Sequence, residues 1–463
     1  MIKRNLNNLA ASARKGLIVA AITSSAILGS AIHANAEGYQ INSQSAKQVG
    51  MGHTGVALKL GAESMLFNPA GMAFMENKFD LSLGITGIKS QIKYTKDSYS
   101  AKTDNPLGTP LFGYIGYKPA RNLAIGVSIT NPVGNSLKWP ANWAGSTLIQ
   151  EINLKGFSIQ PTVSYKFCDF ISIGAGLMID FGNFDLSRAL LPAGGLDAIG
   201  QMIPALQPAI ESFKGQDPVS AKLKGNTKVR VGVNVGVLVN VSEKVSIGAS
   251  YRSKVDFKVN DGEAELLYAN ENVKTVINTV NGVKPGTVPI PPLEAGTFKA
   301  ALPAPSNINV GVAYKPVKDL TLTAELQIVG WKAYDSLNIQ FEENGLLGYS
   351  IKAEKNYKNT VIYRIGGEYT ISKLATVRLG AYYDTTPVRE DLYNPETPGS
   401  DKFAITAGAS IRPLKFMSID LAFAYINGAK TYGSYTDPLS KAVFDGDYKA
   451  HAFMPSIGLS FRF

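Results

Sequence analysis

Apolar side chains alternate with small or polar ones along most of this chain. Between Ile457 and the terminal Phe463, the apolar residues are separated by Gly458, Ser460 and Arg462. The same period of two recurs in residues 123–130, 229–240, 245–252, 308–314, 320–328, 361–369, 377–383, 403–411 and 417–425. Because successive side chains of a strand point to opposite faces, the pattern predicts an all-β fold whose strands each have one apolar face.

The first 36 residues distinguish between two architectures that share this pattern, a soluble β-sandwich and an outer membrane barrel. Positive residues lead into the apolar run 16–22 and then into Ala34-Asn35-Ala36, which predicts a signal peptide over residues 1–36. A soluble β-sandwich alternates too, but it needs no export signal. No later run approaches the ~20 apolar residues of a spanning helix. Exported strands of this kind are expected to close into an outer membrane barrel, because lipid cannot satisfy an open sheet edge.

The connections between the strands alternate in length. Short turns are expected at residues 118–121, 168–169, 242–243, 316–319, 372–373 and 413–415, and long loops near 96–110, 131–147, 188–227, 260–304, 338–356, 386–400 and 427–447. Membrane barrels have short periplasmic turns and longer extracellular loops. Six turns and seven loops predict an antiparallel transmembrane β-barrel of about 14 strands over residues 79–463.

Residues 37–78 do not alternate and are rich in Gly, Ser and Asn. Their length and irregularity predict either a periplasmic extension or a plug inside the barrel. A barrel of this size has room for a plug, because the lumen widens with strand number.

Few residues carry reactive chemistry. Cys168 is the single cysteine, and His53 and His451 are the only histidines after the leader, without a nucleophile motif beside them. We therefore expect no enzyme activity, no metal site and no cofactor. Lys and Arg exceed Asp and Glu by 46 − 36 = 10. Their spread, without a basic cluster among aromatics, predicts no nucleic-acid partner.

A set of short motifs occurs in order along the chain. They are Gly38-Tyr39-Gln40, Asn68-Pro69-Ala70, Asn142-Trp143-Ala144-Gly145, Tyr251-Arg252-Ser253-Lys254-Val255, Leu302-Pro303-Ala304-Pro305, Tyr363-Arg364-Ile365-Gly366 and Asp384-Thr385-Thr386-Pro387-Val388. Together they resemble the FadL family of outer membrane transporters for long-chain fatty acids and other hydrophobic compounds. The resemblance spans nearly the whole mature chain.

The resemblance implies a fourteen-stranded barrel closed by an N-terminal hatch, here residues 37–78 with the motif Asn68, Pro69 and Ala70. It also implies passive uptake, most readily of long-chain fatty acids, with sideways exit through the barrel wall into outer membrane lipid. Aromatic hydrocarbons are the alternative ligands. A general diffusion porin is the alternative class, and a hatch argues against it. We expect a monomer in the outer membrane of a Gram-negative bacterium, assembled through recognition of Phe463 by the barrel assembly machinery.

Candidate ligand-binding residues follow from parity and from the family. Arg188 shares the parity of lumen-facing Gly176 and Asp180, and the resemblance makes it a carboxylate-binding residue. The alternative is pairing with an acidic residue of the protein. The resemblance implies a second basic residue near position 355, for which Lys352, Lys355 and Lys358 compete.

Two further features concern the path of a hydrophobic ligand. An apolar helical stripe predicts an extracellular collecting surface, with a small loop core as the alternative, since Pro204 and Pro208 interrupt the helix. The stripe consists of Leu196, Ile199, Ile203, Leu206, Ile210 and Phe213. In the segment Asn131, Pro132, Val133 and Gly134, proline and glycine predict a strand end with failing pairing, and the family's wall opening matches this place.

Overall fold

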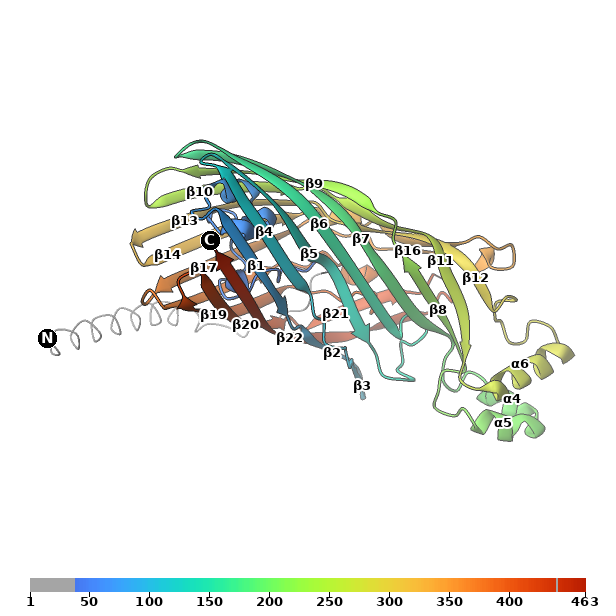
Figure 1. The fold of residues 1–463 in the computed structure, drawn as a ribbon. Helices are drawn as coiled ribbons and strands as arrows, with labels where there is room; N and C mark the ends of the chain where they lie inside the picture. Colours follow the sequence, from blue (N-terminus) through green and yellow to red (C-terminus); the bar gives the residue numbers. More distant parts are fainter. Residues whose placement is uncertain (1–37, 439) are drawn as a thin grey trace.

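Antiparallel strands close a ring in this computed structural model, which describes residues 38–438 and 440–463. The predicted signal peptide, residues 1–36, lies outside the described residues. Within them the ring has 14 strands, which confirms the expected architecture (Figure 1). In ring order they are β1 (Phe79–Thr86), β4 (Leu111–Ala120), β5 (Leu123–Lys138), β6 (Glu151–Cys168), β7 (Ile171–Leu191), β9 (Arg230–Asn240), β10 (Val245–Arg252), β13 (Asn307–Val317), β14 (Leu320–Val329), β17 (Thr360–Thr370), β18 (Ala375–Asp384), β19 (Lys402–Leu414), β20 (Met417–Gly428) and β22 (Val443–Arg462). The ring closes where β1 pairs with β22, with Leu83 opposite Leu459.

The parity of the strands is the predicted one. Val231, Val233 and Val235 on β9 are exposed on the outer face, whereas Asn234 between them is buried towards the lumen. The six predicted short turns all join neighbouring ring strands at one end of the barrel, which is the periplasmic end. Among the described residues, no helix is long and apolar enough to cross a membrane.

The predicted long loops are wrong in part, because much of their length is strand. The wall continues beyond the membrane through β2 (Lys89–Lys96), β3 (Tyr99–Lys102), β8 (Val219–Asn226), β11 (Val255–Tyr268), β12 (Ala295–Ala304), β15 (Ser336–Phe341), β16 (Ile351–Glu354) and β21 (Thr431–Thr436). β8 pairs with both β7 and β11, and β12 with both β11 and β15. These strands face water rather than lipid. They therefore carry charged residues such as Lys222 and Glu265, and the apolar alternation that marks the membrane strands is weak in them.

The described helices lie in the extracellular loops and inside the ring. Beyond the extracellular end of the ring lie α4 (Asp197–Met202), η3 (Pro204–Leu206), α5 (Gln207–Glu211) and α6 (Glu271–Val283), of which Figure 1 shows α4, α5 and α6 together. Single turns η4 (Trp331–Ala333), η5 (Leu347–Tyr349) and η6 (Glu390–Leu392) lie in the loops. Inside the ring are α2 (Ala46–Val49), η1 (Gly61–Glu63), α3 (Ser64–Phe67) and η2 (Pro69–Phe74).

Residues 38–78, here called the interior segment, pack directly against the inner wall. α2 contacts β19, β20 and β22, and η2 contacts β6, β7 and β9. The wall offers glycines at the closest approaches. A side chain at Gly380 would overlap the backbone of Met51 and Gly52, and one at Gly248 would overlap the Val56 carbonyl. These glycines let the backbone of the segment lie against the sheet without side chains between them.

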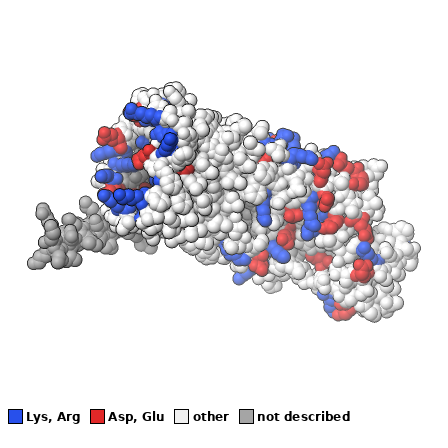
Figure 2. All heavy atoms as spheres, viewed as in Figure 1, with Lys and Arg blue, Asp and Glu red and all other residues white. Residues whose placement is uncertain are grey.

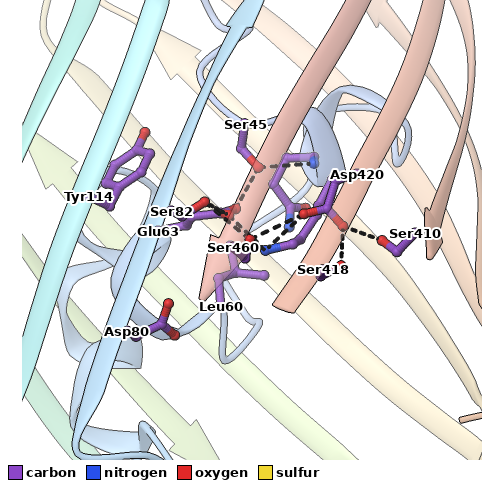
Figure 3. Close-up of polar contacts among 12 residues, drawn as sticks. Ser45, Leu60, Glu63, Asp80, Ser82, Tyr114, Ser410, Ser418, Asp420 and Ser460 are labelled. Atoms are coloured by element: carbon purple, nitrogen blue, oxygen red, sulfur yellow. Dashed lines mark hydrogen bonds and ion pairs between the residues drawn. The ribbon is translucent and has the colours of Figure 1, made fainter. Parts of the chain in front are cut away.

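Buried charges also tie the interior segment to the wall (Figure 3). The ammonium of Lys47 lies 2.8 Å from the Glu63 carboxylate and 3.5 Å from Asp420 on β20. Glu63 accepts hydrogen bonds from Ser45 and from Ser82 on β1, both at 2.5 Å. Breaking one partner of such a network leaves a buried charge unpaired, which costs about 3–5 kcal/mol. The network therefore holds α2 and η1 in one place.

A second set of polar contacts holds the other half of the segment. Glu325 on β14 accepts from the backbone N–H groups of Gly55 at 2.8 Å and Val56 at 3.0 Å, and its other oxygen lies 3.0 Å from Arg364. Arg252 on β10 donates to the Leu66 carbonyl at 3.0 Å. The inward-facing charges of the wall thus satisfy the backbone of an irregular segment.

Gly380→Val is expected to displace the interior segment from the wall. The added methyl groups would occupy space held by the backbone of Met51 and Gly52, and such overpacking costs about 1–3 kcal/mol. We expect a higher ion conductance in planar bilayers than for the wild type. Gly367→Val is the control, because a Cβ there meets its nearest neighbour, Leu322, at 3.4 Å. Unchanged conductance of an assembled Gly380→Val barrel would contradict this account.

Candidate functional site

Arg188 lies on β7 and points into the extracellular half of the lumen. Its Nη2 lies 3.1 Å from a carboxylate oxygen of Asp437, and both side chains are largely buried. Its Nε has no hydrogen-bond partner among residues 38–438 and 440–463. The observed pairing is the alternative that the sequence left open, an arginine balanced by an acidic residue. The carboxylate-binding role of Arg188 stays a prediction.

The structure separates the three competing lysines. Lys352 on β16 and Lys358 are exposed, whereas Lys355 is 1% exposed. The Lys355 ammonium lies 3.4 Å from the Glu396 carboxylate and 5.9 Å from the ring centroid of Tyr334. Lys355 is therefore the lysine of the three that a molecule inside the barrel could reach. Its ligand-binding role likewise stays a prediction.

Aromatic side chains surround these two ion pairs in the extracellular half of the lumen. Tyr39 from the interior segment contacts Trp331 and Tyr334 edge to face, with centroid distances of 5.1 and 5.6 Å. Trp139 and Trp143 stack 4.0 Å apart. The Tyr39 hydroxyl donates to the Pro303 carbonyl at 2.7 Å. This cluster is apolar at its rings and polar at its hydroxyl edges.

The apolar stripe of residues 196–213 is largely buried in a core that it shares with a second extracellular loop. The prolines divide it into α4, η3 and α5, so the continuous helix is wrong. Leu196, Ile210 and Phe213 are buried in a core that also contains α6, while Ile199 and Leu206 pack at its edge. A loop core was the alternative, but the observed core joins two loops and is not formed by residues 196–213 alone. Ile203 and Met202, which is 81% exposed, remain on the surface, and a collecting role for the stripe stays a prediction.

The motif Asn68-Pro69-Ala70 fastens the interior segment to β6, β7 and β9. Asn68 caps η2 by accepting from the Ala70 N–H at 3.1 Å, and its amide donates to the Val237 carbonyl at 2.9 Å. The Ala70 carbonyl accepts from Ser164 at 3.1 Å and Ser172 at 2.9 Å. The motif is thus a structural anchor.

The wall is irregular at residues 131–134. The predicted strand end at this place is wrong, because β5 continues to Lys138. Its pairing with β6 shifts register between Thr130 and Val133 and then resumes to Lys138. On the other side, the pairing with β4 stops at Ile129. Beyond Thr130, β5 continues because its backbone stays paired with β6 along one edge. Its other edge has no partner in β4 there.

The interior segment occupies part of this free edge. The Ile41 N–H donates to the Pro132 carbonyl at 2.9 Å, and the Gly134 N–H donates to the Tyr39 carbonyl at 2.8 Å. The Asn131 side chain accepts from the Leu111 N–H at 2.9 Å. These bonds satisfy backbone groups that would otherwise face hydrocarbon unpaired.

A cavity of about 490 Å³ runs inward from this edge. Near the lipid face it is lined by Leu107, which is 57% exposed, and by Leu111; in the lumen it reaches buried His53. Most of its lining is apolar: Ile41, Ile88, Val133, Leu137, Leu154 and Met454. Its lining thus combines residues of the lumen with residues beside the β4–β5 edge, and an opening through the wall at this place stays a prediction.

Two polar residues at the inner end of the cavity, Lys402 and His53, were not predicted as site residues from the sequence. Lys402 lies 2.9 Å from the Asp384 carboxylate, its cross-strand neighbour on β18. Its inward parity beside Phe403 could have identified it, whereas the ion pair needs the strand register. His53 packs edge to face on Tyr382 at 5.4 Å. Burial, together with the charges of Arg364 and Lys402, lowers the pKa of His53 to about 3, so its imidazole is neutral near pH 7.

A family model described as outer membrane protein transport protein (OMPP1/FadL/TodX) matches residues 27–463. The chain belongs to this family. The long-chain fatty acid transport protein of Salmonella typhi is 24% identical over 405 residues, which is 84% of this chain and 87% of that protein. A FadL homologue from Pseudomonas aeruginosa has a TM-score of 0.77 at 20% identity, covering 92% of this chain and 100% of that structure. The toluene transporter TodX of P. putida has a TM-score of 0.68 at 17% identity, with 93% and 99% covered.

Membership of the family confirms the resemblance that the sequence motifs indicated. The related structures also confirm the barrel fold. This FadL/TodX-family chain is an outer membrane protein of Gram-negative bacteria and a transport channel for hydrophobic compounds. Members of the family are channels rather than enzymes, as expected for this chain.

Lys355→Ala is expected to lower the free energy of unfolding by about 3–5 kcal/mol, because it leaves the Glu396 carboxylate buried without its partner. Lys352→Ala and Lys358→Ala are matched controls in the same loop. Both remove exposed side chains, so each should change the free energy by less than about 0.5 kcal/mol. Denaturant unfolding in detergent, followed by tryptophan fluorescence, measures the three variants. Equal effects would contradict the assignment of Lys355 as the buried lysine.

Proposed function

We propose that this channel takes up long-chain fatty acids by passive diffusion and releases them sideways into the outer membrane. The observation that supports the proposal is the largely apolar cavity of about 490 Å³ whose lining extends from His53 in the lumen to Leu107 and Leu111 beside the β4–β5 edge. A long acyl chain gains about 0.8 kcal/mol per CH₂ by staying in such surroundings. Release into the periplasm would forfeit that gain, whereas release into hydrocarbon keeps it.

The two ion pairs of the lumen favour a ligand with a carboxylate. Arg188 and Lys355 each face one carboxylate of the protein, Asp437 and Glu396, within an otherwise aromatic cluster. A ligand carboxylate can take the place of either acid opposite its cation, and the cation then stays paired while the displaced acid loses its partner. Within the described part of the chain, the Nε of Arg188 has no hydrogen-bond partner, which suits bidentate binding of a carboxylate.

Uptake of aromatic hydrocarbons is the second candidate. The observation in its favour is the density of aromatic rings around the two ion pairs, including the stacked Trp139 and Trp143. An uncharged ring would pack against them without using Arg188. A general diffusion porin is less well supported, because the interior segment lies across the lumen where an open pore would run. We propose that this segment, residues 37–78 in the sequence, acts as a hatch.

Arg188→Ala is expected to weaken fatty acid binding about tenfold to a hundredfold, because a hydrogen bond to a charged group contributes about 1.5–3 kcal/mol. Binding of an uncharged alcohol of the same chain length should change much less. Asp437→Asn is the complementary variant. It removes the competing carboxylate, so fatty acid should bind more tightly than to the wild type. Calorimetric titration of the purified variants measures the binding of the fatty acid and of the alcohol to each of the two. Equal losses for the acid and the alcohol with Arg188→Ala would exclude a direct role of its charge.

Sideways exit is tested by closing the β4–β5 edge. Pro132→Thr restores a backbone donor, and Gly134→Val adds a side chain whose Cβ would lie 2.6 Å from Ile41 Cδ1, inside the cavity lining. The double variant should insert and bind fatty acid, yet support much less uptake by cells that depend on it. Gly367→Val is the control for a wall substitution far from the edge. Wild-type uptake through a double variant whose structure shows the edge sealed would refute this route.

A further inference from the structure

A second cavity, of about 250 Å³, opens at the periplasmic end of the barrel. It lies between residues 57–60 of the interior segment and the ends of ring strands β10, β13, β14 and β17 to β22. Its rim carries cations from separate parts of the chain: Lys59, Lys244, Lys315, Arg412, Lys415 and Arg462. We call this cavity the basic vestibule. Figure 2 shows Lys and Arg gathered at the same end of the molecule.

Several of these cations lack a counter-charge. The acidic residues of the lining are Glu243 and Glu368, and Glu368 already pairs with Arg378 at 2.6 Å. Among the described residues, no ion pair is formed by Lys244, Lys315 or Lys415. The vestibule therefore holds unbalanced positive charge in a partly enclosed space, where an anion is attracted more strongly than on an open surface.

The interior segment contributes its own cation to this charge. The Lys59 ammonium lies 4.8 Å from the ring centroid of Phe74. Burial and the nearby charges of Lys315 and Lys166 lower the pKa of Lys59. Burial and these neighbouring cations disfavour the charged form of Lys59. A bound anion would stabilise that charged form.

The lining shows from which side an occupant can come. The vestibule is bounded by lumen-facing Ser418 and Ser460 and by apolar residues of the interior segment, Ala57, Leu58 and Leu60. The lipid-facing neighbours Leu459 and Phe461 do not line it, whereas Phe416 and Met417, at the turn before β20, do. Because the cavity opens among the turns at the periplasmic end, a water-soluble occupant can enter it from the periplasm.

We propose that the basic vestibule binds an acidic peptide segment of a soluble periplasmic protein. The unpaired lysines come from three different turns or strand ends, so a chain with several carboxylates can contact more of them than a single small anion can. The apolar residues below the rim suit the methylene groups of such a segment. This docking surface is independent of the ligand that the channel carries.

The test uses the full-length protein in nonionic detergent and a fluorescein-labelled hexaglutamate peptide. Fluorescence anisotropy should show binding at low ionic strength that weakens at least about tenfold as salt is raised, because salt screens exposed charges. The triple variant Lys244→Glu/Lys315→Glu/Lys415→Glu should lose at least about tenfold in affinity. The matched control Lys93→Glu/Lys284→Glu/Lys332→Glu makes the same change of net charge at exposed extracellular positions, and should bind like the wild type.

A triple substitution by glutamine guards against misassembly, since it removes the charges without reversing them. It should also weaken binding, with both triple variants keeping the heat-modifiable migration of a folded barrel. Equal losses in the vestibule and control variants would overturn the proposal, because net charge would then explain the binding. Binding of hexaglutamine as tight as that of hexaglutamate would overturn it too. So would inorganic phosphate that binds as tightly as the peptide, since the vestibule would then be a small-anion site.

Discussion

The structure depends on the requirement that every backbone N–H and C=O within a lipid bilayer finds a hydrogen-bond partner. Strands meet this requirement only when the sheet closes, and here the first ring strand pairs with the last over Asp80 to Thr86. Closure brings residues nearly four hundred positions apart into register. It also creates the lumen, whose inward-facing side chains are freed from contact with lipid and can be polar, charged or absent.

The interior segment uses that freedom in two ways. Where the wall has glycine, as at Gly248 and Gly380, the backbone of the segment lies directly on the sheet. Where the wall has charge, as at Glu325 and Asp420, it satisfies the polar groups of the segment. The same segment supplies partners to the edge of β5 that β4 leaves free. The interior segment is thus bound both to the inner wall and to the free edge of β5.

The alternation of side chains was enough to predict most of the ring strands, because lipid imposes one rule on every outward position. Together with the signal peptide and the turn residues, it also predicted the barrel. The same rule does not act above the membrane. The outer faces of strands such as β8 and β11 there carry polar and charged residues instead of lipid-facing apolar ones, so these strands resembled loops in the sequence. The apolar stripe of residues 196–213 was recognised, but its main partner, α6, lies about sixty residues further along the chain. Local periodicity cannot show which surface covers an apolar face.

In the candidate site, too, local sequence signals placed single residues, whereas the contacts between distant residues needed the folded chain. Parity on β7 directed Arg188 into the lumen, and the family motifs identified Lys355 as one of three candidates. Only the folded chain brought Arg188 to Asp437 and Lys355 to Glu396, and only the register of β18 and β19 paired Asp384 with Lys402. The sequence by itself determined that this chain forms a closed membrane barrel, because that requirement acts on each residue locally. The tertiary structure decided which buried charges meet and where the wall has a free edge, because those contacts join segments whose separation along the chain carries no local signal.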